Sequence, residues 1–222
     1  MKTMSASHAE SAKVTGARPA GRRTVDLMTR TLHGLMALSF TVGYITAESE
    51  RTMALHIAMG YTLGVLFLVR VLWGWVGPRP VRWGVLKHKV LSIRLLTQPS
   101  ASVQPFLMRL QAPMLAGSVV LVLVCMLPLV LSGMSADQDL MGWSDLWGEL
   151  HDALAQGMLM GVLLHVALVL VISVLRRKNL ALPMLTGRVR DVGPDLVRHN
   201  YTWIAALLVL GILAFWVWLG LA

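Results

Sequence analysis

The chain has 222 residues, of which 56% are hydrophobic and only 14% are charged, so it is too apolar for an ordinary soluble domain. Its formal net charge of +9 would suit a nucleic-acid ligand, but the basic residues gather in segments that flank the apolar ones, which argues against that interpretation. The single cysteine, Cys125, excludes an internal disulfide framework.

Five apolar segments are long enough, or nearly so, to cross a bilayer. Because lipid offers backbone groups no hydrogen-bond partners, such segments must be helical. The sequence therefore predicts an all-α membrane protein, an up-down bundle of four core transmembrane helices plus a fifth C-terminal span. The five predicted spans are residues 31–47, 53–76, 114–134, 148–175 and 201–221.

The charges between these spans predict their orientation. If the N-terminus is cytoplasmic, nineteen of the 20 Lys and Arg residues lie on the inner side, and only Arg51 lies outside. Seven of the 11 acidic residues lie outside. This is the positive-inside pattern, and five spans then place the C-terminus outside.

The chain begins with residues 1–25, which are rich in Ser, Ala, Lys and Arg and are expected to form a disordered basic cytoplasmic tail. The first span then carries His33, fourteen residues from its outer end at Ala47. The second span carries His56 near its outer end and Arg70 fourteen residues later. The short link between these spans makes them antiparallel neighbours.

Pro78 and Pro80 are expected to stop the second helix. The basic inner loop 79–113 follows, in which VLKHKVLSIRLL is compatible with an amphipathic helix lying in the membrane plane. We interpret His88 in this segment as interfacial. The third span has no ionisable residue except Cys125 and is interpreted as scaffold, with a kink expected at Pro128.

The fourth span carries His151 and His165. Fourteen residues of helix cover about 21 Å and return to within about 40° of the starting direction, so both rings leave the same face. Counted from the outside, His151 shares its depth with His56, and His165 shares its depth with His33. Ionisable groups at such depth indicate a functional site.

RRKNL closes the fourth helix, and LPMLTGRVRDVGPD is expected to be a loop. The last span has no polar residue in its interior and is expected to pack peripherally. His199, at its inner edge, is either an interface anchor or a quinone contact. We find no internal repeat and no soluble domain.

Four histidines at two matched depths, from three helices, indicate ligands for a cofactor. A lone membrane histidine is more often an interhelical hydrogen-bond donor. Two-histidine pairs without Cys or carboxylate nearby do not suit a structural zinc, whereas a haem iron needs only two axial imidazoles. The chain has no C-x-x-C-H, so covalently attached haem is excluded. The predicted axial and metal ligands are His33, His56, His151 and His165.

Other residues near these histidines are candidates for cofactor binding. Arg30 and Arg70 lie towards the inner pair and would suit haem propionates, although a snorkelling interfacial arginine is the alternative. Gly60 and Gly161 lie one turn from His56 and His165 and would leave room for a porphyrin, although close helix packing explains such glycines equally. Six-coordinate iron has no open site, so this arrangement favours electron transfer over chemistry at the iron.

Several motifs together resemble the prokaryotic cytochrome b561 family of di-haem membrane cytochromes. They are RTLH at 30–33, LHIAMGY at 55–61, RVLWGWVGPR at 70–79, ELHDALA at 149–155, LLHVALV at 163–169 and NLALPMLTGRVR at 179–190. The resemblance implies two haem b groups, one held by His33 with His165 and one by His56 with His151. It implies a four-helix di-haem domain over residues 26–190, followed by an additional transmembrane helix within 191–222.

Two features depart from the family pattern. Gly34 follows the first histidine where the family often has Trp, and a fifth span is appended. With this fifth span the chain resembles a branch of the family that is related to the b subunits of hydrogenases and dehydrogenases.

The resemblance implies electron exchange, in a bacterial inner membrane, between the quinone pool and a periplasmic redox partner such as a c-type cytochrome. The protein is then expected to contact lipid and quinone, to bind no nucleic acid, and to be an electron-transfer protein rather than a catalyst. The outer loop SADQDLMGWSDLWGEL is acidic. This acidity either simply accompanies the positive-inside charge pattern or forms a docking surface for a basic partner. The alternatives are a superoxide-oxidising, quinone-reducing oxidoreductase, a b-type anchor subunit, and a haem-free transporter or scaffold.

Overall fold

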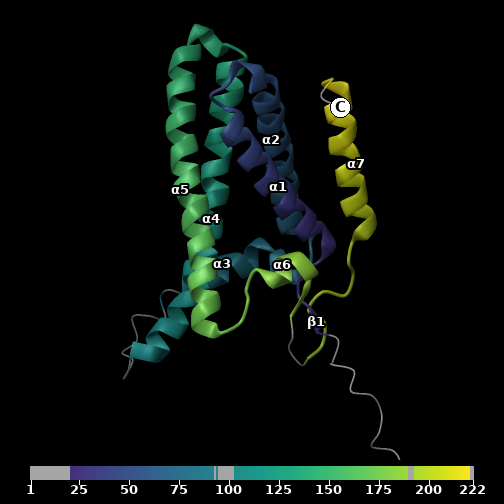
Figure 1. The fold of residues 1–222 in the computed structure, drawn as a ribbon. Coiled ribbons are helices and arrows are strands. Elements are labelled where there is room, and N and C mark those ends of the chain that lie inside the picture. The colour runs from purple at the N-terminus through teal and green to yellow at the C-terminus, as the bar shows by residue number, and fades with distance from the viewer. Residues whose placement is uncertain (1–20, 93, 95–102, 190–192, 221–222) are drawn as a thin grey trace, which may run out of the picture.

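The structure is a computed structural model that describes residues 21–92, 94, 103–189 and 193–220, and for 103–108 it describes the helix without its side chains. Four long helices dominate it (Figure 1). They are α1 (Leu27–Thr46), α2 (Met53–Val76), α4 (Val103–Asp137) and α5 (Ser144–Arg176). The short turn η1 (Glu50–Thr52) joins α1 to α2, and η4 (Leu140–Gly142) joins α4 to α5.

The long helices pack as two antiparallel pairs. α1 packs along α2, α4 packs along α5, and α2 also contacts α4. Among the described elements, the backbone of α5 lies mainly along α4. The space between α5 and the first pair is therefore bridged by side chains, such as Tyr44, which donates a hydrogen bond to Gln156.

Shorter elements gather at the end of the bundle that holds the N-terminus of α1 (Figure 1). The helix α3 (Trp83–Leu91) lies across this end, as does α6 (Leu182–Thr186). The strand β1 (Arg22–Arg23) pairs antiparallel with β2 (Arg188–Val189). The last helix, α7 (Thr202–Trp218), packs against α1 at the edge of the bundle, as its lack of interior polar residues predicted.

Local sequence explains where the helices begin and end. Asp26 caps α1, because its Oδ1 accepts a hydrogen bond from the backbone N–H of Thr29 at 2.8 Å. α2 ends at Val76, directly before Gly77 and Pro78. α5 ends where Arg177 adopts a left-handed conformation with φ of 50°.

The described helices confirm the all-α membrane fold but only part of the predicted span count. Three helical segments are long and apolar enough to cross a membrane, namely Glu50–Val76, Arg109–Asp137 and Ser144–Arg176. α7 is apolar but shorter. In α1, Arg30 and His33 interrupt the apolar sequence. Both helices nevertheless lie close to the predicted spans 31–47 and 201–221.

Secondary structure extends into segments that the sequence analysis assigned to loops. α4 begins at Val103, so the predicted loop 79–113 ends earlier than expected. The predicted loop after α5 contains α6 and β2, because Pro183 favours a first helical turn and Gly187, with φ of 76°, ends it. β1 falls within the predicted tail 1–25, of which residues 1–20 lie outside the described residues.

Candidate functional site

The side chains of His56 and His151 meet towards the end of the bundle formed by η1 and η4. Their ring centroids are 5.9 Å apart and their planes are nearly perpendicular, at 87°. His56 comes from the first turn of α2, and His151 comes from the eighth residue of α5. The structure thus brings together the two histidines that the sequence assigned to the outer level.

Hydrogen bonds determine which nitrogen of each ring is free. The backbone carbonyl oxygen of Gly43 lies 2.8 Å from Nδ1 of His56, and that of Leu129 lies 3.0 Å from Nδ1 of His151. A carbonyl oxygen only accepts, so each Nδ1 carries the proton and donates. The Nε2 atom of each ring therefore keeps its lone pair and is available as a ligand.

The spacing of this pair fits a single iron between the two rings. A metal–imidazole bond is about 2 Å long and the ring centre lies about 1 Å beyond the nitrogen, so two trans imidazoles have centres about 6 Å apart. The observed 5.9 Å matches this requirement. Among the described residues, no three His, Cys, Asp or Glu side chains gather as a metal site made of protein ligands alone would need.

His33 on α1 and His165 on α5 are the candidates for the second pair, and their pairing stays a prediction. Nδ1 of His165 lies 3.0 Å from Oγ of Ser118, and that hydroxyl donates its only proton to the carbonyl oxygen of Leu115. Ser118 therefore accepts from His165, which leaves Nε2 of His165 free. Within the described residues the ring of His33 makes no hydrogen bond, so both of its nitrogens are available.

Three residues of α4 lie against His151 or His165. They were not predicted from the sequence, because this helix was interpreted as scaffold. Ser118 contacts His165, and Ser132, whose Oγ donates to Leu129, lies 3.3 Å from Nδ1 of His151. Gly133 lies beside the His151 ring, where a Cβ atom would come within 2.8 Å of Cε1.

A spacing in the sequence could have revealed the two serines. Ser118 and Ser132 are fourteen residues apart, the same separation as His151 and His165 on the antiparallel neighbouring helix. Matched spacings on paired antiparallel helices place Ser132 opposite His151 and Ser118 opposite His165.

Arg30 and Arg70 lie at the inner end but differ in their surroundings. Arg30 donates from Nη2 to the carbonyl oxygen of Leu185. Arg70 stacks on the ring of Trp83 with its Cζ 5.0 Å from the ring centroid. Nε of Arg30 and Nη1 of Arg70 are both buried without a hydrogen-bond partner. Such orphaned donors fit an acidic group from a bound cofactor.

The two candidate glycines occupy different environments. A Cβ atom on Gly60 would meet nothing within 4 Å, so α2 borders open space there, as a bulky cofactor requires. Gly161 is buried, and a Cβ atom there would lie 3.7 Å from Val122 on α4. This contact favours the helix-packing interpretation of Gly161.

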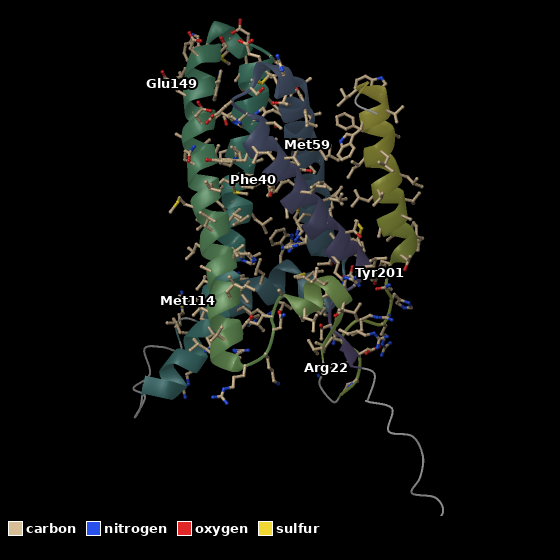
Figure 2. The ribbon with its side chains drawn as sticks, in the orientation of Figure 1. Arg22, Phe40, Met59, Met114, Glu149 and Tyr201 are labelled. Atoms are coloured by element: carbon tan, nitrogen blue, oxygen red, sulfur yellow. The ribbon has the colours of Figure 1, made fainter. Side chains whose placement is uncertain are left out.

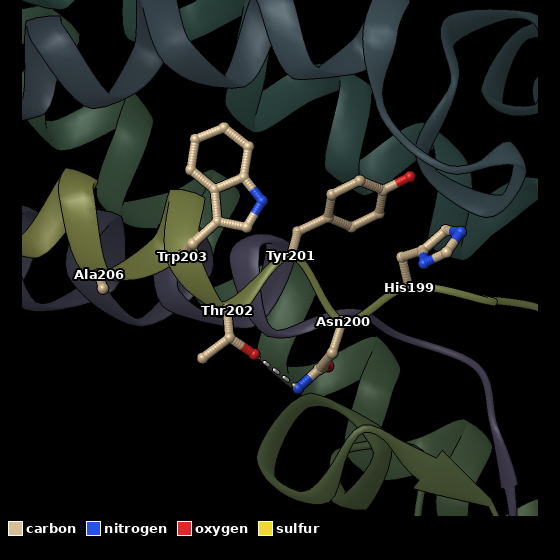
Figure 3. A pocket seen from close by; sticks show the side chains of 6 residues that line it. All are labelled: His199, Asn200, Tyr201, Thr202, Trp203 and Ala206. Carbon is tan, nitrogen blue, oxygen red and sulfur yellow. Dashed lines mark hydrogen bonds between the residues drawn. The ribbon is translucent and has the colours of Figure 1, made fainter.

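A separate cleft of about 570 Å³ opens at the inner end of α7 (Figure 3). None of the four candidate histidines lines it. Tyr201 in this cleft packs edge-on against Trp73, with centroids 5.1 Å apart, so the cleft is built on the inner end of α2. His199 therefore remains either an interface anchor or a quinone contact. The lining residues are His199, Asn200, Tyr201, Thr202, Trp203 and Ala206.

Comparison with known proteins identifies one related family. The sequence model of a family described as "Prokaryotic cytochrome b561" matches residues 24–187, which is most of the chain and includes all four histidines. No curated protein and no solved structure matches the chain. The match confirms the family resemblance inferred from the histidine motifs.

Proposed function

We propose that this chain, which belongs to the prokaryotic cytochrome b561 family, passes electrons across the membrane through two b-type haems, between the quinone pool and a periplasmic redox partner such as a c-type cytochrome. The family is one of membrane cytochromes b involved in electron transfer. In this proposal His56 and His151 hold the outer haem, and His33 and His165 hold the inner haem. When bound, each haem supplies a one-electron ferric–ferrous couple.

The observation that carries this proposal is the geometry of the outer pair. The ring centroids of His56 and His151 lie 5.9 Å apart, and the Nδ1 atom of each ring donates a hydrogen bond to a backbone carbonyl oxygen. The protein thereby holds both rings in the tautomer and at the spacing that axial ligation needs. Two axial imidazoles leave no coordination position for a substrate, which supports electron transfer rather than catalysis at the iron.

The proposed membrane placement uses five spans, with α1 and α7 crossing beside the three longer helices. The N-terminus is cytoplasmic and the C-terminus is periplasmic in a bacterial inner membrane. Charge supports this orientation: Arg22 and Tyr201 mark the basic end of the bundle, and Glu149 lies at the opposite, acidic end (Figure 2). An acidic outer surface suits a basic partner protein.

The same surface weighs against the superoxide-oxidising alternative. Superoxide is an anion, and exposed carboxylates at Asp137, Asp139, Asp145 and Glu149 would repel it from the outer end. A b-type anchor subunit in a hydrogenase or dehydrogenase complex would use the same four ligands, so the ligand experiment below serves both roles.

The test is haem quantitation and spectroscopy on His33→Ala, His56→Ala, His151→Ala and His165→Ala, with the exposed His88 on α3 replaced as the control. His33→Ala and His165→Ala are expected to lose the same haem, and His56→Ala and His151→Ala the other. His88→Ala is expected to keep both. A candidate variant with unchanged haem content and spectrum would remove that residue from the ligand set.

A further inference from the structure

A buried carboxylate sits at the start of α1. Asp26 is 0% exposed. Its Oδ1 accepts from the backbone N–H of Thr29 at 2.8 Å, and its Oδ2 accepts from the Thr29 hydroxyl at 2.7 Å. That hydroxyl accepts in turn from Nε1 of Trp73 on α2, at 3.1 Å. A carboxylate buried this fully is costly without a nearby positive charge.

Arg70 is a positive charge on the neighbouring helix. It lies three residues before Trp73 on α2, so the two side chains leave neighbouring positions on one face. The hydrogen bond from Trp73 to Thr29 places this face of α2 against the start of α1, where Asp26 caps the helix. The Arg70 guanidinium stacks on Trp83 at 5.0 Å, and its Nη1 is buried with no hydrogen-bond partner.

Trp83 is itself held in position beside this guanidinium. Its indole Nε1 donates to the carbonyl oxygen of Val71 at 3.0 Å. The ring also lies directly over Gly74, where a Cβ atom would come within 2.2 Å of Nε1. Trp83 therefore holds the Arg70 guanidinium on its ring, and Arg70 as a whole is partly buried with its Nη1 atom fully buried.

Arg70 lies at about the level of His33, and Asp26 lies closer to the N-terminus of α1. α1 and α2 are antiparallel, and the Trp73–Thr29 hydrogen bond fixes their register. Arg70 is three residues closer to the outer end than Trp73, so it lies about level with Leu32 and His33 on α1. Asp26 precedes His33 by seven residues, which is about 10 Å along the helix and within about 20° of the same direction.

We propose that the charges of Asp26 and Arg70 act in opposite directions on the reduction potential of the inner haem. This inference rests on the proposed function. Reduction adds one electron to the iron, so the Arg70 charge stabilises the reduced form and the Asp26 charge opposes it. Asp26 limits the effect of Arg70, while Trp83 and Thr29 keep both groups in place.

The test is a spectroscopic redox titration of the purified, haem-loaded chain and its Asp26→Asn and Arg70→Gln variants. His56→Ala, expected to retain only the inner haem, assigns the inner component. Asp26→Asn preserves the helix cap, because Asn caps helices about as well as Asp. This variant is expected to raise the midpoint reduction potential of the inner haem. At a fixed potential, the ratio of reduced to oxidised inner haem should change about tenfold, which corresponds to about 59 mV for a one-electron couple.

Arg70→Gln is expected to lower the same midpoint, while Lys87→Gln on the exposed face of α3 leaves it unchanged. Asp26→Asn carries the test alone if Arg70→Gln does not retain haem. The inference is overturned if Asp26→Asn keeps two haems at unchanged potentials, if both variants shift the midpoint in one direction, or if Asp26→Asn loses the inner haem. Fewer than two haems in the unmodified chain would instead contradict the proposed function.

Discussion

At the scale of single residues, two serines on α4 lie within hydrogen-bond distance of the two histidines of α5. Ser118 is the hydrogen-bond partner of Nδ1 of His165, whereas Nδ1 of His151 has both Ser132 and the carbonyl oxygen of Leu129. Because the carbonyl remains after the hydroxyl is removed, the two serines are not equivalent. The orientation of His165 therefore depends on its serine more than that of His151 does.

We expect Ser118→Ala to weaken retention of the inner haem by about tenfold or more, because His165 loses the group that fixes its tautomer and orientation. Ser132→Ala should have a smaller effect on the outer haem. Haem retention during titration with a competing haem-binding protein measures both. Ser135→Ala is the matched control, since that hydroxyl donates to Leu131 of its own helix. Equal losses in Ser118→Ala and Ser132→Ala would contradict this assignment.

Gly133 provides a second prediction at this scale. A methyl group there would come within 2.8 Å of Cε1 and 3.0 Å of Nδ1 of His151, closer than carbon atoms approach without displacement. Gly133→Ala should therefore displace the ring and reduce the outer haem content while leaving the inner haem intact. Gly117→Ala on the same helix, where a Cβ meets nothing within 4 Å, should change neither. Intact outer haem in Gly133→Ala would show that the ring is not held as described.

The sequence identified four histidines as candidates because ionisable groups are rare in apolar helices and their spacing is regular. The structure brings His56 next to His151, and the pairing of His33 with His165 stays a prediction. The sequence did not predict Ser118, Ser132 or Gly133, because small and hydroxyl residues are common in membrane helices, where hydroxyls also bond to their own backbone. It named Arg70 without its partners. The burial of Asp26 and the position of Trp83 depend on packing between helices that a sequence does not specify.

At the scale of elements, long apolar segments made α2, α4 and α5 predictable to within a few residues at most of their ends. Among the short elements, α3 overlaps the segment for which an amphipathic helix was considered, whereas α6 and the β1–β2 pair were missed. α6 and the β1–β2 pair form because backbone groups near the ends of the long helices need partners, as when the N–H groups of Thr24 and Val25 both donate to the carbonyl oxygen of Gly187. Such local pairing leaves no periodic signal.

α7 is attached to the bundle by its apolar face and by one hydrogen bond between side chains. Nε1 of Trp216 donates to the Thr62 hydroxyl on α2 at 3.0 Å. Ala205 and Ile212 of α7 are buried against Met28, Leu32 and Leu66. The appended helix is therefore part of the folded bundle and not a loose anchor.

Trp216→Phe should lower the free energy of unfolding by about 1 kcal/mol, because it removes this hydrogen bond and leaves most of the apolar contact. Thermal unfolding in detergent measures the change. The control is Trp203→Phe, since Trp203 is 68% exposed. If the two variants had the same melting temperature, the hydrogen bond would contribute nothing to the attachment of α7.

At the scale of the whole molecule, the two ends of the bundle differ in charge and in histidine level. α3, α6 and the β1–β2 pair gather at the basic end, and η4 with its flanking acidic residues forms the other (Figure 1). The proposed topology predicts that a reporter enzyme active only in the periplasm is active when fused after Ala222 and inactive when fused near residue 180. The reverse activities would invert the orientation and the assignment of inner and outer haems.

The central claim is that two pairs of histidines each hold one haem within this helical bundle. The most direct measurement is the haem-to-protein ratio of the purified chain, together with its low-temperature electron paramagnetic resonance spectrum. The account predicts about two non-covalent haems per chain, both low-spin with two imidazole ligands. A colourless chain from cells supplied with haem, or a single haem that persists in both His33→Ala and His56→Ala, would contradict it.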